Sequence, residues 1–107
     1  MYARRVSMNL KPNSTAEFTQ RLENDVIPML RKQSGFRDEI TFVGPAGTEA
    51  FAVSLWDTKQ NADNYNLGSY TEVTKILAKV VDGTPRVETY EVANSTFHKI
   101  AAPAATA

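Results

Sequence analysis

The chain has 107 residues, of which twelve are basic and twelve are acidic, so its formal net charge at pH 7 is zero. A chain of this length forms one domain, and we expect residues 1–98 to be that domain and 99–107 a tail. Neither sign of charge forms a long block, which argues against nucleic acid or an anionic membrane as a partner. Because cysteine is absent, disulfides, zinc–thiolate sites and thiol nucleophiles are excluded.

The first ten residues lack the continuous apolar run of a signal peptide or membrane anchor, since Arg4, Arg5 and Asn9 interrupt them. Apolar residues at positions 6, 8 and 10 alternate with polar residues at 5, 7 and 9, which predicts a half-buried strand over residues 2–10. The sequence therefore predicts a cytoplasmic protein that begins with a strand and has no membrane partner.

A helix is predicted from about Thr15, because Ser14 and Glu17 have the spacing of a capping box. Apolar residues then recur at helical spacing from position 18 to position 30. Pro28 removes one helical hydrogen bond, so we expect a kink there. The helix is expected to end at Ser34 and Gly35.

Residues 36–43 and 49–56 are two β-prone runs joined by a segment rich in turn formers, and they predict a hairpin. After Trp56, the pair Asp57 and Thr58 offers a cap for a short helix. A second capping box over residues 69–72 predicts another helix that reaches position 80 and ends at residues 82–85. The last strand is expected over about residues 86–97, with mixed faces that suit an edge strand.

This order of elements predicts an α+β fold of the ferredoxin-like βαββαβ type, with an antiparallel four-stranded sheet and the helices on one face. In the strand over 49–56 neither face is strongly polar, which indicates that both faces are covered. One layer of helices covers only one face in a domain this small. We therefore expect a homodimer, in which a second subunit covers the other face.

Several kinds of site are poorly supported by the residues present. His98 is the only histidine and has no acidic residue at ligand spacing, so neither a metal site nor a Ser-His-Asp triad is expected. The glycines at 44 and 47 belong to the predicted hairpin and not to a phosphate-binding loop. We therefore predict no metal and no cofactor.

The best candidate site is aromatic. Trp56, Tyr65 and Tyr70 could form an apolar wall with hydrogen-bonding tips, together with Tyr90, and the small residues at 50, 52 and 54 leave room beside the tryptophan. Such a wall suits a small, flat aromatic ligand, although close helix packing with Trp56 in the core explains the same residues and is the simpler interpretation. Arg5 and Ser7 share one strand face and could be polar groups of the cavity, or could be solvent-exposed at the end of the sheet.

Three segments together carry a family resemblance: IPMLRKQSGF at residues 27–36, SLWDT at 54–58 and VETYEV at 87–92. In this order and spacing, over roughly residues 2–97, the chain resembles the antibiotic biosynthesis monooxygenase family of dimeric α/β barrels. The resemblance implies the ferredoxin-like subunit described above, paired through its sheets. It agrees with the expectation of a homodimer.

The resemblance also implies an activity. The quinone-forming members need neither metal nor flavin, because a phenol or anthrone loses a proton and then reacts with dioxygen in a dry cavity. Trp56 matches the cavity tryptophan of those enzymes, but Ala52 and Ala62 stand where they carry an asparagine and a tyrosine.

Another branch of the family degrades haem. Its asparagine, tryptophan and histidine fall on about Ser7, Tyr65 and Lys75, so the haem ligand is missing and haem degradation is disfavoured.

Three hypotheses about function follow. The first is a cofactor-independent oxygenase acting on a small aromatic or quinol-type substrate, with Trp56 as the catalytic residue and Tyr65, Tyr70, Ser7 and Arg5 as substrate-binding residues. The second is a dimeric module without catalytic activity, which binds a small apolar ligand or packs its interior shut. The third is a member of the family with an unrelated reaction. An enclosed cavity of a few hundred cubic ångströms beside Trp56, with Tyr65 or Ser7 reaching into it, would favour an enzyme or a ligand binder, and a filled interior would argue against both.

Overall fold

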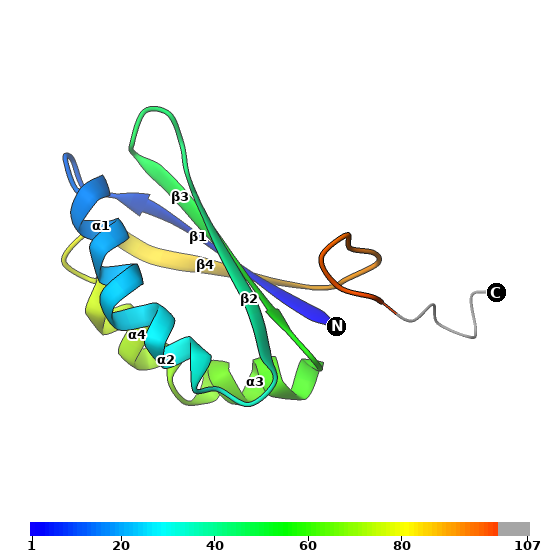
Figure 1. Cartoon of the computed structure of the whole chain (residues 1–107). Coiled ribbons are helices and arrows are strands. Elements are labelled where there is room, and N and C mark those ends of the chain that lie inside the picture. Colours follow the sequence, from blue (N-terminus) through cyan, green and yellow to red (C-terminus); the bar gives the residue numbers. More distant parts are fainter. Residues whose placement is uncertain (101–107) are drawn as a thin grey trace.

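The computed structural model describes residues 1–100, so the predicted tail at 99–107 lies largely outside the described residues. Within them the chain forms a sheet and a layer of helices, in the predicted α+β, ferredoxin-like order (Figure 1). The elements are β1 (Tyr2–Leu10), α1 (Thr15–Arg21), the π-helical turn η1 (Leu22–Val26), α2 (Ile27–Arg31), β2 (Phe36–Val43), β3 (Glu49–Trp56), α3 (Lys59–Leu67), α4 (Tyr70–Leu77) and β4 (Val81–Glu91).

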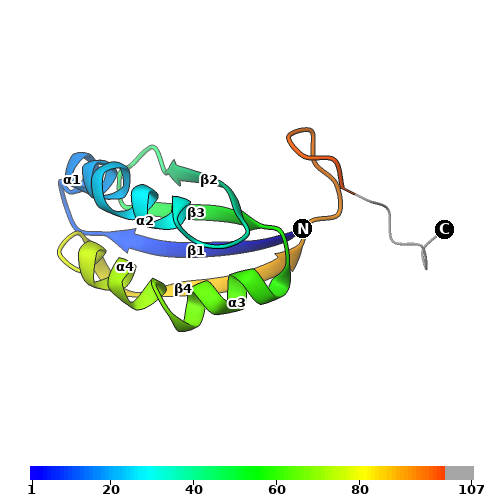
Figure 2. The same cartoon turned by 60° about the horizontal axis from the view of Figure 1, so that its bottom comes forward.

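The sheet is antiparallel and has the strand order β2-β3-β1-β4. All the helices lie on one side of it, with α1 and α2 beside each other and α3 and α4 forming a second group (Figure 2). Because successive side chains of a strand point to opposite faces, Arg4 of β1 faces the helices and Arg5 faces away from them. The prediction of a four-stranded antiparallel sheet covered by helices on one face is confirmed.

The first helical region differs from the single kinked helix that the sequence predicts. The irregularity is the π-helical turn η1, which comes before Pro28, and Pro28 itself lies in the first turn of α2. The backbone N–H of Ile27 donates to the carbonyl of Leu22, five residues back. The wider turn relieves the crowding that the proline ring imposes on the carbonyl four residues before it. The expected capping box is wrong, because Ser14 makes no side-chain cap and its hydroxyl donates to the carbonyl of Pro12.

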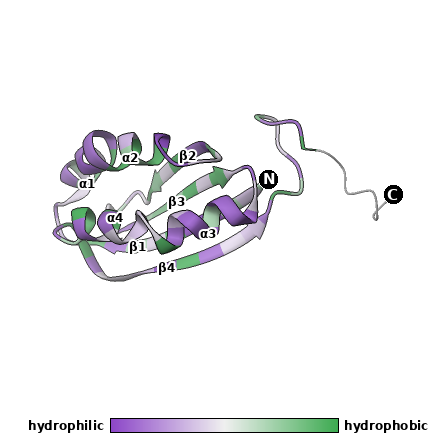
Figure 3. Cartoon of the chain, turned by 90° about the horizontal axis from the view of Figure 1, so that it is seen from below, coloured by the Kyte–Doolittle hydropathy of each residue, from purple (hydrophilic) through white to green (hydrophobic). Residues whose placement is uncertain are grey.

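The second helical region confirms one predicted cap and contradicts another. Thr58 caps α3, with its hydroxyl oxygen accepting a hydrogen bond from the backbone N–H of Asn61. Ser69 makes no side-chain cap on α4, so the second capping box is wrong. Helix α3 is largely hydrophilic (Figure 3), and its buried residues are Ala62 and Tyr65. These two positions fix how α3 lies on the sheet.

Strand β4 begins five residues earlier and ends six residues earlier than the predicted 86–97. Its first part contains Gly83, which has a φ of 79°, and the pairing with β1 shifts register between Ser7 and Asn9. A bulge of this kind lets a strand continue through glycine and proline, which read in the sequence as the end of an element. The segment after Glu91 leaves the sheet, so the end predicted at 97 is wrong as well.

Candidate functional site

A cavity of about 50 Å³ lies between the sheet and the helices, and we call it the helix-side cavity. Aliphatic side chains from β1, η1, α2 and α4 form most of its wall. Its polar and aromatic lining residues come from β1, β2, β3 and the second helical region: Arg4, Glu39, Ser54, Tyr65 and Tyr70. The cavity is therefore a small apolar space with a few polar groups, which is the usual composition of a small-molecule site.

Trp56 lies in the core beside this cavity, and its side chain is fully buried. Its indole N–H donates to the hydroxyl oxygen of Ser54 at 2.9 Å, and its ring stacks on Tyr65 with centroids 4.9 Å apart. Trp56 is not itself a lining residue, but both of these partners are. In this geometry Trp56 acts on the cavity by holding Ser54 and Tyr65 in place.

The sequence suggested an aromatic wall that included Tyr90, but Tyr90 lies on the opposite face of the sheet and is 48% exposed, so that part of the prediction is wrong. Tyr65 and Tyr70 form the wall. Their ring centroids lie 5.9 Å apart, and Tyr65 is only 4% exposed. Burial raises the pKa of Tyr65 to about 12, and burial also raises the pKa of Tyr70. Both groups are therefore neutral phenols near pH 7, able to donate a hydrogen bond into the cavity.

Arg4 is the residue that the sequence analysis missed. It is 2% exposed, and its guanidinium carbon lies 4.4 Å from the ring centroid of Tyr70 and 5.0 Å from that of Tyr65. Its Nη2 donates to the side-chain oxygen of Asn66 at 2.9 Å. Burial lowers its pKa, and the nearby tyrosines oppose that shift.

The Arg4 cation lacks an anionic partner. Among the residues that the structure describes, no carboxylate lies within 4.0 Å of its guanidinium nitrogens. The sequence did contain a signal for this position, because Arg4 has the same strand parity as Met8, which is buried, and Val6, which is partly buried.

Glu39 of β2 was also missed, and it is the acidic residue of the cavity. It lies opposite Ser54 of β3, and Ser54 lies opposite Arg4 of β1 on its other side. The hydroxyl of Thr41 donates to the Glu39 carboxylate. Burial raises the pKa of Glu39, and the hydrogen bond from Thr41 partly offsets that effect. The cavity thus contains a buried cation, Arg4, on one side of the small residue Ser54, and a carboxyl group, Glu39, on the other side.

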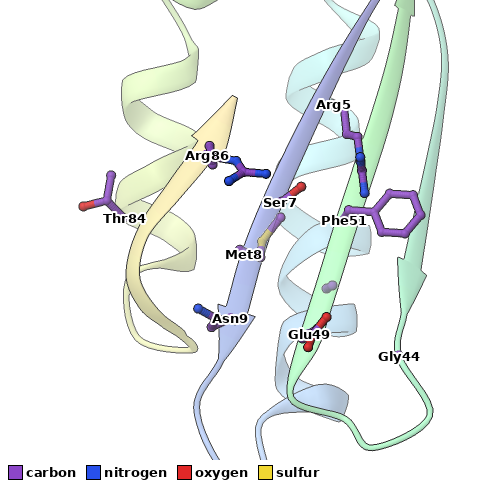
Figure 4. A pocket seen from close by; sticks show the side chains of 10 residues that line it. Arg5, Ser7, Met8, Asn9, Gly44, Glu49, Phe51, Thr84 and Arg86 are labelled. Atoms are coloured by element: carbon purple, nitrogen blue, oxygen red, sulfur yellow. The ribbon is translucent and has the colours of Figure 1, made fainter. Parts of the chain in front are cut away.

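Arg5 and Ser7 lie on the other face of the sheet, so the expectation that they share a cavity with the aromatic residues is wrong. They line a more open hollow of about 410 Å³, shown in Figure 4 with the helices behind the strands. The Arg5 guanidinium lies 4.6 Å from the ring centroid of Phe51. The alternation of β1 explains the error, because it sends Arg5 and Ser7 away from the side that Arg4 occupies.

His98 contacts the side chain of Asp38, a partner that its sequence spacing did not suggest. Within residues 1–100, no group of three or more histidine, cysteine, aspartate or glutamate side chains is placed to hold a metal ion. None of the helices described in that range is both long enough and apolar enough to span a membrane.

No protein-family model and no curated protein matches the sequence. Solved structures do match the fold. A monooxygenase from Streptomyces coelicolor, in complex with nanaomycin D, has a TM-score of 0.75 and 14% identity over 92% of each chain. A cofactor-independent oxygenase from Streptomyces nogalater has a TM-score of 0.73 and 9% identity, over 89% of this chain and 95% of the other. A candidate antibiotic biosynthesis monooxygenase from Bordetella bronchiseptica has a TM-score of 0.72 and 16% identity, over 85% of this chain and 95% of the other.

This chain has the antibiotic biosynthesis monooxygenase fold. The resemblance inferred from the sequence is confirmed at that level. Two positions, 52 and 62, differ from the family pattern, and the structure places them in different surroundings. Ala52 lines the helix-side cavity, whereas Ala62 is buried at 1% exposure in the core. The charged groups of this cavity are Arg4 and Glu39, contributed by β1 and β2.

Proposed function

We propose that this protein is a cofactor-independent monooxygenase-like enzyme that acts on a small aromatic or quinol-type substrate in the helix-side cavity. The observation that carries the proposal is the buried Arg4 cation, which faces the helix-side cavity and has no carboxylate within 4.0 Å among the residues that the structure describes. A buried charge without a partner is costly, so a site that keeps one is suited to an anion. A phenolate formed from the substrate is such an anion.

The chemistry needs no group beyond the substrate and dioxygen. Loss of a phenolic proton makes the ring electron-rich, and dioxygen is the oxidant. With hydroquinone, one oxygen atom enters a ring C–H bond and the other leaves as water, so hydroquinone and dioxygen give hydroxybenzoquinone and water. Arg4 stabilises the negative charge that develops, while Tyr65 and Tyr70 donate hydrogen bonds from their neutral hydroxyls. Trp56 positions Tyr65 and Ser54.

A second candidate is a module without catalytic activity, and the cavity volume favours it. A cavity that binds benzene measures about 150 Å³, and the helix-side cavity measures about 50 Å³. A ring can enter only if the wall moves outward. Under this alternative the aromatic residues only close the interior, and no monocyclic ligand binds.

Dioxygen consumption with a panel of monocyclic quinols, hydroquinone first, tests the proposal. Arg4→Gln removes the cation and is expected to lower the rate about 10²–10³-fold, because enzymes lose about that much when one group that stabilises the charge developing in the transition state is removed. Arg31→Gln is the matched control, because it makes the same change at an exposed position of α2, away from the cavity and from the sheet face proposed for the dimer. Equal loss in both variants would contradict the assignment. No dioxygen consumption together with no binding would support the non-catalytic module.

The sheet face opposite the helices supports the homodimer. Ile40, Phe42 and Tyr90 belong to this face and are 41%, 46% and 48% exposed. On the same face Arg5 Nε and Glu88 Oε1 are buried, and neither has a hydrogen-bond partner among the described residues, although Arg86 Nη2 lies 3.6 Å from Glu88 Oε1. Buried polar atoms of this kind are normally paired. A second copy seated on this face would cover the apolar side chains and supply those partners.

Sedimentation at micromolar concentration tests the dimer. We expect wild type to sediment as a dimer, and Phe42→Glu, which places a charge on the exposed apolar surface, to sediment as a monomer. A monomeric wild type would rule out this face as a stable interface.

A further inference from the structure

We propose that Glu39 is the general base of the helix-side cavity, and that its substrate presents an acidic hydroxyl to Glu39 while an oxygen at its other end faces Arg4. This inference rests on the proposed function and names both a further catalytic residue and the class of substrate. That class is a single ring that carries two oxygen substituents, such as a quinol.

The strand order places the two charged groups on opposite sides of the cavity. Arg4 and Glu39 both neighbour Ser54 on the helix side of the sheet, one from β1 and the other from β2. Strands two apart in a sheet lie about 10 Å from each other. The two side chains make no salt bridge within 4.0 Å, although both line the same small cavity. A ligand between them therefore meets a cation at one end and a carboxyl group at the other.

The surroundings of Glu39 suit a base that works near neutral pH. Burial raises its pKa above that of an ordinary glutamate, which brings it closer to the pH at which proton transfer is efficient. The hydroxyl of Thr41 donates to the carboxylate and so orients it. A base needs both its protonation state and its orientation set in this way, and an exposed glutamate has neither.

The proton-transfer step balances without any further group. The O–H bond of the substrate breaks, its electron pair stays on the substrate oxygen, and the proton moves to a carboxylate oxygen of Glu39. Conjugation through the ring carries part of the negative charge to the oxygen at the other end, where the Arg4 cation lies. Dioxygen then oxidises this anion as described above.

The pH response of the cavity can be assigned to Glu39. The other titratable or charged lining groups are Arg4 from β1, Tyr65 from α3 and Tyr70 from α4. Neither tyrosine titrates below pH 8, because their pKa values are raised, and an arginine keeps its proton there even with a lowered pKa. The wall formed by η1 and α2 is apolar, with Leu22, Val26 and Leu30.

The experiment measures the affinity of hydroquinone by calorimetry from pH 4.5 to pH 8, a range in which hydroquinone stays neutral. In wild type the affinity should fall about tenfold as the pH is lowered through the Glu39 pKa, because a hydrogen bond to a charged acceptor is stronger than one to a neutral acceptor. Glu39→Gln should bind hydroquinone more weakly than wild type at pH 8, with an affinity that does not depend on pH. Glu39→Asp should restore part of the pH dependence of the affinity. Glu23→Gln, the same change on the exposed helix surface, should behave as wild type.

Dioxygen consumption by the same proteins separates the two proposals. A loss of about 10²–10⁴-fold in Glu39→Gln, with the fall in rate on the acidic side of the pH profile gone, supports the assignment. If wild type binds hydroquinone with the Glu39-dependent pH response but consumes no dioxygen, the oxygenase function fails while the contact with Glu39 stands. If Glu39→Gln keeps the pH response or the rate of wild type, or if wild type does not bind, the inference is overturned.

Discussion

Replacing Arg4 by methionine is expected to stabilise the fold and to abolish ligand binding. The cation is 2% exposed and makes no salt bridge with any carboxylate in residues 1–100, and the effective cost of burying an ion is several kcal/mol. The substitution loses two contacts with tyrosine rings, worth about 0.5–2 kcal/mol each, and the hydrogen bond to Asn66, worth about 1.5–3 kcal/mol. Methionine is unbranched and apolar, so it fills the same channel between the rings.

We expect a net gain of about 1–2 kcal/mol, at the lower end of the range measured when buried ionic groups are replaced by apolar ones. Urea denaturation followed by Trp56 fluorescence measures this change in the free energy of unfolding. Each kcal/mol of added stability is expected to raise the Tm by roughly 4–8 °C. Hydroquinone affinity is expected to fall at least tenfold in the same variant. Arg5→Met is the control for the loss of a positive charge from β1. A less stable Arg4→Met, or one that binds as wild type does, would refute the view of Arg4 as a cation kept for a ligand.

Three further predictions concern the surroundings of the cavity. Ser54→Ala leaves the buried indole N–H of Trp56 without its acceptor, so thermal unfolding should show a loss of about 1–3 kcal/mol; no change would mean that water replaces the hydroxyl. Leu30→Ala should cost about 2–5 kcal/mol in stability and yet tighten binding of monocyclic phenols, because it enlarges a cavity now too small for a ring; weaker binding in calorimetry would contradict this. Glu39 has a raised pKa in the folded protein, so its contribution to stability is lost as the pH rises from its unfolded value of about 4.3 through the folded one. Glu39→Gln should therefore be more stable than wild type at pH 7 but not at pH 4, and an equal difference in urea denaturation at both pH values would exclude this cause.

The order of the elements and the aromatic wall could be read from the sequence, because both rest on periodicity over many residues. Trp56, Tyr65 and Tyr70 do lie together. The charged residues of the cavity, Arg4 and Glu39, could not be predicted from the sequence in the same way. The charge of Arg4 suggested an exposed position, although its parity on β1 agrees with the buried side. Glu39 belongs to a strand whose burial pattern is irregular, so nothing local marked it.

The wrong boundaries and caps have local causes of their own. Gly83 and Pro85 indicate the end of an element in most sequences, but here they belong to a bulge within a paired strand. Ser14 has a competing acceptor in the carbonyl of Pro12, two residues before it. Signals of this kind depend on which backbone group lies nearest, and sequence spacing alone does not decide that.

The π-helical turn η1 determines where the cavity can widen. Leu22 and Val26, its first and last residues, both belong to the cavity wall. π-turns are rare inside helices and occur frequently at functional sites, and two side chains of this turn line the cavity that an incoming ring would have to enlarge. We expect the wall to move outward at this turn when a substrate enters, so amide hydrogen exchange over residues 22–27 should change when hydroquinone binds while exchange in the sheet does not. The irregular turn of the first helical region is thus the part of the wall that we expect to open.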